Sequence, residues 1–334
     1  MLLRFRIRSI QAGDVPECFQ LMCERPFHTE LYADREKAAI AMRAWRLLLA
    51  RDAVNGILAE TPDVPAGQRI VTFGISAFVR KDWLRAYFRD PFPLVGSFIV
   101  DRCSATVDEE IILSNREVRH ANSGSGLHSI ALCYGWSRQI PPEHVFEFRQ
   151  WSIRCYLEAH KGYRLAEIVN ECVSKIEAEA FISSGSWIKR SNYESFYRRQ
   201  AGDPPPERPV LVGLTKQEAE ETGRMGAATA GLFIWREPRY CFSPEQQKLI
   251  LLAREHPADK DLAVILGITP DALGRRWDRI FKRVEALQPG DDPIFSPDFG
   301  PSGKRARLLQ RLEKEFHELR PHEFRRPLGQ SDSK

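Results

Sequence analysis

Positively charged side chains recur at helical spacing between residues 271 and 283, and they are the residues in this sequence best suited to bind a ligand. Arg275, Arg279 and Lys282 follow one another at intervals of three or four residues, which places them on one face of a helix. Guanidinium and ammonium groups bind phosphate oxygens and base edges. The pattern therefore indicates a surface that reads double-stranded DNA.

The same stretch carries an apolar stripe that a DNA-reading helix needs on its other side. Leu273, Trp277, Ile280, Phe281 and Val284 fall at i, i+4, i+7, i+8 and i+11, the spacing of one buried helix face. A recognition helix requires this division, with its apolar side packed on a small core and its cations free. The alternative is an amphipathic helix of a bundle whose charged face is only solvated.

Local signals place two further helices before this one. Ser243 to Gln246 form a capping box with Pro244 at the first helical position. Asp259 can cap a second helix, and Gly267 supplies the left-handed residue that ends it. Thr269 and Pro270 then restart the chain. Short helices joined by a Gly-Ile-Thr turn predict a helix-turn-helix.

From Phe242 to Val284 the chain resembles the LuxR/FixJ-type DNA-binding module of bacterial transcription regulators. The matching residues include Asp259 to Ala263, Ile268-Thr269 and Arg279-Ile280, whereas Gln246, His256 and Gly274 depart from the family pattern. The resemblance implies groove reading at Gly274, Arg275 and Asp278, and phosphate contacts from Lys260 and Thr269. The complete predicted DNA-binding set is Lys260, Thr269, Asp271, Gly274, Arg275, Arg276, Asp278, Arg279 and Lys282.

The N-terminal half offers titratable residues without a catalytic pattern. His120, His128, His144 and His160 are isolated from one another, and a single His is more often structural than catalytic. Glu167, Glu171, Glu177 and Glu179 fall in a helical pattern and are expected on solvated faces. Neither HExxH, GxSxG nor a Cys-His pair stands out. We therefore expect no enzyme activity, no metal and no cofactor.

The elements expected in this half are those of an α/β domain. Strands are predicted at 3–10, 69–79 and 130–136, a long helix at 35–53, and helical structure over 144–176. This order weakly resembles the N-acetyltransferase (GNAT) fold, whose pyrophosphate loop is best matched by Lys161 to Ala166 with a helix following. Arg164 stands where the family has Gly, which implies a scaffold used as a sensor. The alternative is an unrelated α/β domain.

Composition excludes several classes of protein. The formal net charge is +4, too small to indicate nucleic-acid binding by itself, and the hydrophobic fraction of 43% is ordinary for a globular protein. No apolar run reaches membrane-spanning length. The seven cysteines form no CxxC pair, which favours reduced thiols in the cytoplasm over a zinc site.

We predict four segments: an α/β, GNAT-like sensor over 1–200, a Pro-rich connector with a small strand platform over 201–241, an all-α helix-turn-helix domain over 242–288, and a loop, helix and tail over 289–334. The expected function is a cytoplasmic transcription regulator that binds DNA as a homodimer and senses an unknown small molecule or protein. The alternative is a GNAT-like acyltransferase with an accessory helical module that binds a protein partner.

Overall fold

The structure is a computed structural model that describes residues 5–25, 27–61, 69–137, 145–185, 187–200, 205, 207–221, 228–256, 258–287 and 300–323. The chain divides into two compact units, unit 1 from Met1 to Ile234 and unit 2 from Trp235 to Lys334. Within the described residues, no helix is both long enough and apolar enough to cross a lipid bilayer. The two units are taken separately below.

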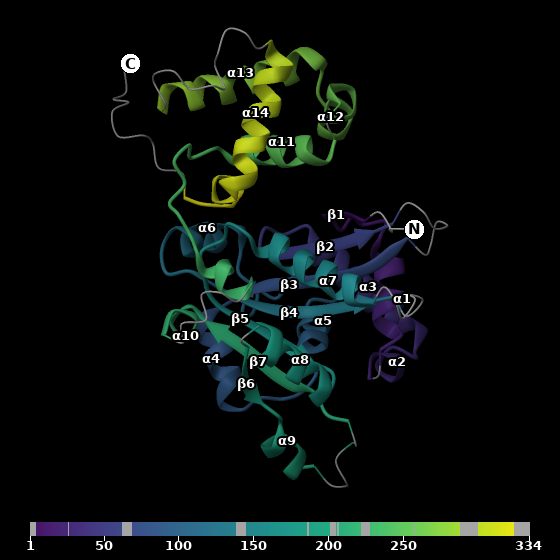
Figure 1. The fold of residues 1–334 in the computed structure, drawn as a ribbon. Coiled ribbons are helices and arrows are strands. Elements are labelled where there is room, and N and C mark those ends of the chain that lie inside the picture. Colours follow the sequence, from purple (N-terminus) through teal and green to yellow (C-terminus); the bar gives the residue numbers. More distant parts are fainter. Residues whose placement is uncertain are drawn as a thin grey trace. The chain divides into compact units, whose positions relative to one another are not determined.

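Unit 1 is built on one seven-stranded sheet (Figure 1). Its strands are β1 (Arg6–Ser9), β2 (Val54–Glu60), β3 (Ile70–Val79), β4 (Leu127–Trp136), β5 (Leu165–Cys172), β6 (Ile188–Ser191) and β7 (Val210–Thr215). Their spatial order is β1-β2-β3-β4-β5-β7-β6. All neighbours are antiparallel except β4 and β5, which are parallel. This mixed sheet confirms the α/β class predicted for the N-terminal part.

Helices cover both faces of the sheet (Figure 1). They are α1 (Val15–Cys23), α2 (His28–Leu31), α3 (Arg35–Leu49), α4 (Lys81–Arg89), α5 (Val95–Arg102), α6 (Asn115–Ser123), α7 (Val145–His160), α8 (Lys175–Gly185), α9 (Glu194–Arg198), α10 (Lys216–Glu221) and the 3-10 helix η3 (Ala228–Phe233). On β3, Phe73 contacts Trp45 of α3, while its neighbour Thr72 bonds to Ser152 of α7. Because side chains alternate across a strand, α3 and α7 lie on opposite faces.

Strands β4 and β5 separate at their carboxyl ends. Their pairing runs from Leu127 opposite Leu165 to Ile130 opposite Val169 and extends no further. Leu132 is the extra residue of a β-bulge against β3, since Ile75 lies opposite Cys133 and Ser76 opposite Ala131. A bulge bends its strand and increases the local twist. The sheet is therefore open between the ends of its two central strands.

Helix α5 packs directly on this bulge through a glycine. A Cβ atom built on Gly96 would lie 1.9 Å from the Leu132 carbonyl oxygen, which is backbone and cannot swing aside. Only a residue without a side chain lets α5 approach β4 so closely. Gly96 thus fixes the position of α5 over the opening between β4 and β5.

We expect Gly96→Ala to destabilise the protein by about 1–3 kcal/mol, the usual cost of overpacking a filled site. Gly74→Ala is the matched control, because a Cβ there would meet only the Tyr134 Cβ atom at 3.9 Å. Urea denaturation of both variants measures the difference. Equal midpoints for Gly96→Ala and the parent protein would show that α5 does not depend on this contact.

The described residues of unit 2 form helices only: α11 (Pro244–Glu255), α12 (Asp259–Leu266), α13 (Pro270–Leu287), α14 (Pro301–Lys314) and the 3-10 helix η5 (Phe316–Leu319). Ser243 and Gln246 form the predicted capping box, and Gly267 ends α12 with φ +62°. Leu273, Trp277 and Ile280 are buried against Leu308 and Leu312 of α14. These local helix signals are confirmed, whereas the cap predicted at Asp259 is wrong: the N-cap residue of α12 is Ala258, and no side-chain cap forms there.

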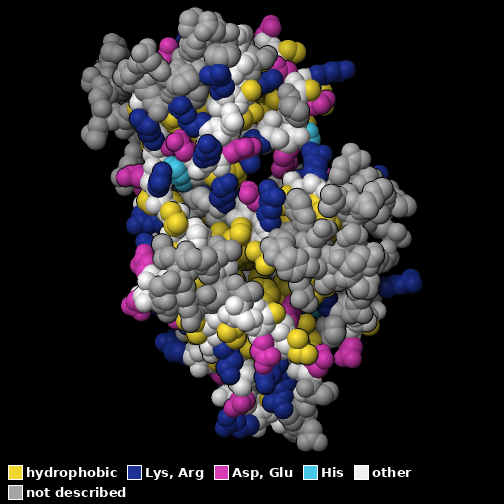
Figure 2. Space-filling model, viewed as in Figure 1, with side chains coloured by type: hydrophobic (Ala, Val, Ile, Leu, Met, Phe, Trp, Pro, Cys, Tyr) yellow, Lys and Arg dark blue, Asp and Glu magenta, His cyan; other side chains and the backbone are white. Residues whose placement is uncertain are grey.

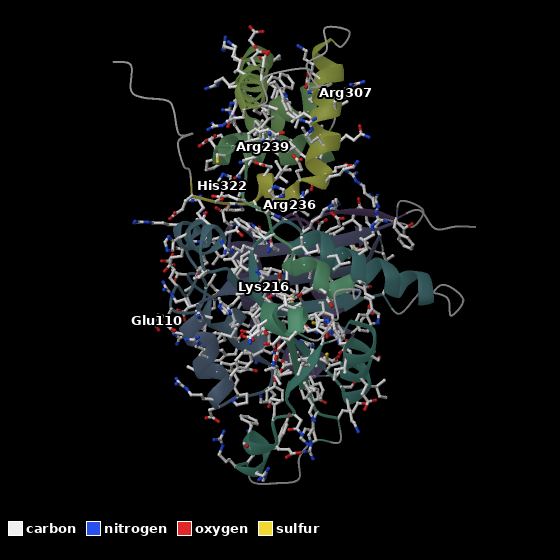
Figure 3. The ribbon with its side chains drawn as sticks, turned by 60° about the vertical axis from the view of Figure 1, so that its left-hand side comes forward. Glu110, Lys216, Arg236, Arg239, Arg307 and His322 are labelled. Carbon is white, nitrogen blue, oxygen red and sulfur yellow. The ribbon has the colours of Figure 1, made fainter. Side chains whose placement is uncertain are left out.

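A buried carboxylate joins the two ends of unit 2. Glu318 accepts hydrogen bonds from the backbone N–H groups of Arg239 at 2.5 Å and Tyr240 at 2.9 Å. Gln247 donates its side-chain amide to the carbonyl of Arg320 at 2.8 Å and lies 3.1 Å from the His322 ring (Arg239 and His322 are labelled in Figure 3). Burial raises the pKa of Glu318 to about 7.

Several predicted elements were wrong. The helical pattern over 144–176 is interrupted by strand β5, and strand β2 was missed. Within the expected strand platform over 201–241, Ala228–Phe233 form the 3-10 helix η3. Strand β7, expected in a separate platform, lies inside the main sheet between β5 and β6. Outside the described residues lie 201–204, 206 and 222–227 of the predicted connector and platform, loop residues 288–299 and the tail from 324. The four-segment division stays a prediction.

Candidate functional site

The predicted DNA-binding residues lie on α12 and α13, where they were expected. Lys260 is exposed on α12, Thr269 is exposed just before α13, and the other seven follow along α13. All but the half-buried Arg276 are exposed. In Figure 2 the Lys and Arg side chains of both units are interspersed with Asp and Glu, so this view shows no face of a single charge. The arrangement is that of a solvated amphipathic helix.

A cluster around Glu171, near the carboxyl end of β5, is the strongest candidate site. The Glu171 Oε1 atom accepts hydrogen bonds from the Tyr193 hydroxyl at 2.5 Å and from the Leu94 backbone N–H at 2.9 Å. The Tyr87 hydroxyl lies 3.0 Å from that of Tyr193. These contacts join β5, the start of α5, the start of α9 and helix α4. Both of these bonds go to one oxygen, Oε1.

The environment shifts the acidity of this cluster. Burial raises the pKa of Glu171 to about 7, against the opposing effect of hydrogen bonds from Tyr193, Leu94 and Val95. Burial and the neighbouring Glu171 charge raise the pKa of Tyr193 well above its usual value, so its phenol stays protonated. A carboxyl group with a pKa near neutrality is suited to take up and release protons. Perturbed groups of this kind gather at functional sites.

The backbone holding Glu171 is strained at two places. Leu94 has φ +62° and Tyr193 has φ +58°, both in the left-handed region that side chains other than glycine rarely adopt. The described residues contain four such non-glycine positions, and two of them donate to this one carboxyl group. Strain of this kind persists where the surrounding structure enforces it, and it concentrates at active sites and ligand clamps.

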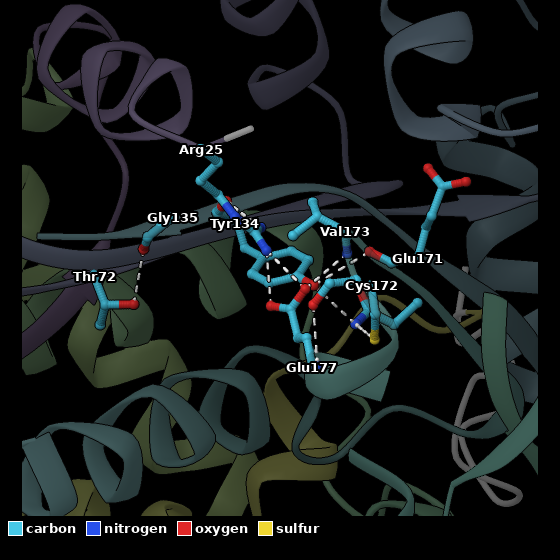
Figure 4. A network of polar contacts seen from close by, with 10 residues as sticks. Arg25, Thr72, Tyr134, Gly135, Glu171, Cys172, Val173 and Glu177 are labelled. Carbon is cyan, nitrogen blue, oxygen red and sulfur yellow. Dashed lines mark hydrogen bonds and ion pairs between the residues drawn. The ribbon is translucent and has the colours of Figure 1, made fainter. Parts of the chain in front are cut away.

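A second polar network bridges the opening between β4 and β5 (Figure 4). Arg25 donates to the Tyr134 carbonyl at 3.0 Å and pairs with the Glu177 carboxylate at 2.7 Å. Its guanidinium stacks over the rings of Tyr134 and Trp136, at 4.2 and 4.7 Å. The Tyr134 hydroxyl in turn donates to the Glu171 carbonyl at 3.2 Å. The network ties the two strand ends together.

Figure 4 shows the Glu171 side chain pointing away from this network, although its carbonyl belongs to it. The Glu171 carboxyl group and the Arg25–Glu177 ion pair therefore differ in role. Arg25 and Glu177 neutralise each other, and each is nearly buried, with side-chain exposures of 7% and 12%. Glu171 has no cationic partner among its hydrogen bonds and is free to change its charge.

His160, His128 and Glu167 have structural partners, whereas His144 lies outside the described residues. His160 is buried and lies 2.9 Å from the Ser76 hydroxyl and 3.0 Å from that of Ser129. His128 lies 3.2 Å from Glu167, which is its neighbour across β4 and β5. Among the described residues, no three His, Cys, Asp or Glu side chains are grouped to hold a metal ion.

Two interpretations of this half were wrong. Glu167 and Glu171 do not lie on a helix, because the segment is strand β5, on which Glu167 is buried and Glu171 is half-buried. The predicted pyrophosphate loop at Lys161 to Ala166 is the turn from α7 into β5, and no helix follows it directly. In this turn the Arg164 backbone N–H donates a hydrogen bond to the Asn122 side-chain oxygen at 2.7 Å, so the N–H group holds the turn against α6.

No family model matches the chain, and no curated protein matches its sequence. Similar solved structures include the C-terminal condensation domain of Ebony in complex with β-alanyl-dopamine, at 12% identity and a TM-score of 0.43, covering 64% of this chain and 100% of that one. The aminoglycoside acetyltransferase AAC(6')-Ib in complex with coenzyme A has 11% identity and a TM-score of 0.33, covering 66% and 99%. FeeM, an N-acyl amino acid synthase from uncultured soil microbes, has 10% identity and a TM-score of 0.35, covering 69% and 98%.

These likenesses concern the fold alone. The described elements of unit 1 form an α/β fold with a seven-stranded mixed sheet and the single parallel pair β4–β5. None of the three neighbours described above is named as a LuxR/FixJ-type regulator.

The predicted function is contradicted. We expected a DNA-binding transcription regulator without enzyme activity, whereas two of the three structures described above are named as an acetyltransferase and an N-acyl amino acid synthase. None of the three is named as a DNA-binding protein, so the comparisons do not support the expected DNA partner. The charged face of α13 does not by itself indicate DNA binding, because any amphipathic surface helix exposes such a face.

Proposed function

We propose that unit 1 is an acyltransferase that moves an acyl group from a thioester to an amine, with Glu171 as its general base. The observation that carries this proposal is the Glu171 carboxyl group, held by Tyr193 and by Leu94 at the opening between β4 and β5. Its pKa of about 7 suits proton transfer at neutral pH. The neighbours named as acyl-transferring enzymes support the choice of reaction.

The reaction balances with one proton acceptor. The nitrogen lone pair of the neutral amine attacks the thioester carbonyl carbon, and the C–N bond forms while an N–H proton passes to Glu171 Oε2. The C–S bond then breaks, and the thiolate leaves and is protonated. Glu171 returns its proton to the thiolate or to water, so the carboxylate is restored. Amide and thiol are the products.

Tyr193 and Leu94 position the base in this scheme. Their two donors hold Oε1 at the strand end, and in this scheme Oε2 receives the proton. The N-terminus of α5, which starts at Val95, adds its positive dipole end beside the carboxylate. Burial raises the pKa of Glu171 to about 7, and the hydrogen bonds from Tyr193, Leu94 and Val95 oppose that rise.

The pH dependence of turnover tests the proposal. The acceptor should be an aniline, which stays neutral near pH 7, so that only the enzyme titrates. Because Glu171 acts when it is deprotonated, kcat should rise about tenfold per pH unit below pH 7 and become level above it. Thiol release from an acetyl thioester measures kcat. A profile that is flat between pH 5 and 8 would exclude Glu171 as the base.

A further inference from the structure

A row of aromatic rings connects the Glu171 site to the protein surface. Tyr87, next to Tyr193, is stacked on Trp83 with ring centroids 5.7 Å apart and an interplanar angle of 3°. Phe92 meets the edge of Tyr87 at 5.2 Å, and Phe98 meets Phe92 at 4.9 Å. The rings come from α4, from the segment between α4 and α5, and from α5.

Exposure increases along this row. Tyr87 and Tyr193 are buried, at 4% and 1% exposure, whereas Trp83 and Phe92 are half-buried and Phe98 is 38% exposed. Phe98 is therefore a large aromatic side chain that packs on one side and meets solvent on the other.

The exposed Phe98 ring and one of the donors to Glu171 come from neighbouring turns of the same helix. The Leu94 N–H donates to Glu171, and the Phe98 N–H donates to the Leu94 carbonyl at 2.9 Å, so Phe98 lies one helical turn further along the chain. Four residues of α-helix rise about 6 Å. A short ethylene linker between an amino nitrogen and an aromatic ring spans a comparable length.

Resting on the proposed function, we propose that the acceptor is an arylalkylamine, with its ring against Phe98 and Phe92 and its nitrogen at Glu171. Edge-to-face and offset-stacked ring pairs contribute about 0.5–1.5 kcal/mol beyond the area that they bury. An acceptor that arrives as an ammonium ion also gains from the faces of the rings. An aliphatic amine of equal volume gains neither term.

The experiment compares 2-phenylethylamine with 2-cyclohexylethylamine, which has the same length without an aromatic ring. With an acetyl thioester as donor, thiol release gives kcat/KM for each amine. The parent protein should prefer the phenyl compound by about 2- to 10-fold, which is the ring-pair energy expressed as a ratio. Phe98→Leu should bring this ratio close to one by raising KM for the phenyl compound alone. Phe98→Trp should preserve the preference.

Ile176→Ala, which changes an exposed apolar side chain on α8, is the control and should leave both rates unchanged. Circular dichroism verifies that each variant is folded. Equal rates for the two amines, or an unchanged preference in Phe98→Leu, would overturn the inference and leave the acyltransferase proposal standing. Absence of transfer to either amine by the parent protein would overturn both.

Discussion

Glu171→Gln should lower kcat for acyl transfer by about 10²- to 10⁴-fold, the usual contribution of a positioned general base. The amide has nearly the shape of the carboxyl group, and its carbonyl oxygen can still accept from the Tyr193 hydroxyl and the Leu94 N–H. It cannot take up the amine proton. KM for the thioester should therefore stay within a few-fold of the parent value.

Glu167→Gln is the matched control, because Glu167 lies on the same strand and the same face, four residues earlier, and contacts His128. It should retain most of the activity. Thermal unfolding should show Glu171→Gln to be at least as stable as the parent protein, since a neutral amide avoids burying a charge. Activity above half of the parent value in a folded Glu171→Gln variant would remove Glu171 from the reaction.

Arg25→Met should destabilise unit 1 by about 3–5 kcal/mol, the largest stability effect that we expect from a single substitution. The guanidinium pairs with the nearly buried Glu177 carboxylate and also holds the Tyr134 carbonyl. Without it, Glu177 keeps a hydrogen bond from the Val173 N–H at 2.7 Å but loses its counter-charge. An uncompensated buried charge is the main cost.

The double variant Arg25→Met/Glu177→Gln should recover much of this loss, because no charge is then left unpaired. Urea denaturation of both single variants and the double variant gives the coupling energy. Arg199→Met is the comparison on an exposed pair: Arg199 and Asp90 are 2.6 Å apart with side-chain exposures of 57% and 66%, so the change should be below about 1 kcal/mol. Additive effects of the two single variants would show that the pair does not act as a unit.

The sequence predicted well where the signals are local. Ser243 and Gln246 cap α11, and Gly267 ends α12, because these residues satisfy backbone groups within a few positions of themselves. Strand β3 was also predicted from its alternating apolar residues. Strand β5 was missed because its apolar run is short and lies between Glu-containing stretches of helical pattern.

The candidate site was beyond sequence reasoning for a different reason. The site brings together three residues that are far apart in the sequence, Leu94, Glu171 and Tyr193. No pattern in the sequence around Glu171 predicts these contacts. The left-handed backbone at Leu94 and Tyr193 is enforced by tertiary contacts rather than by residue type, since neither is glycine. Only the alternation of Leu165, Glu167 and Val169 offered a signal that the glutamates face inward.

Unit 2 cannot complete its core while the chain is still short during synthesis. Its buried residues include Leu308, Leu312, Phe316 and Leu319, which pack with side chains from α11 and α13. Glu318 must then reach back over 78 and 79 residues to Tyr240 and Arg239. All seven sheet strands of unit 1 precede residue 216. Domains fold as units in the order in which they are synthesised. Unit 1 should therefore fold on the ribosome before unit 2. Until α14 and η5 are synthesised, the apolar stripes of α11 to α13 should stay exposed to solvent.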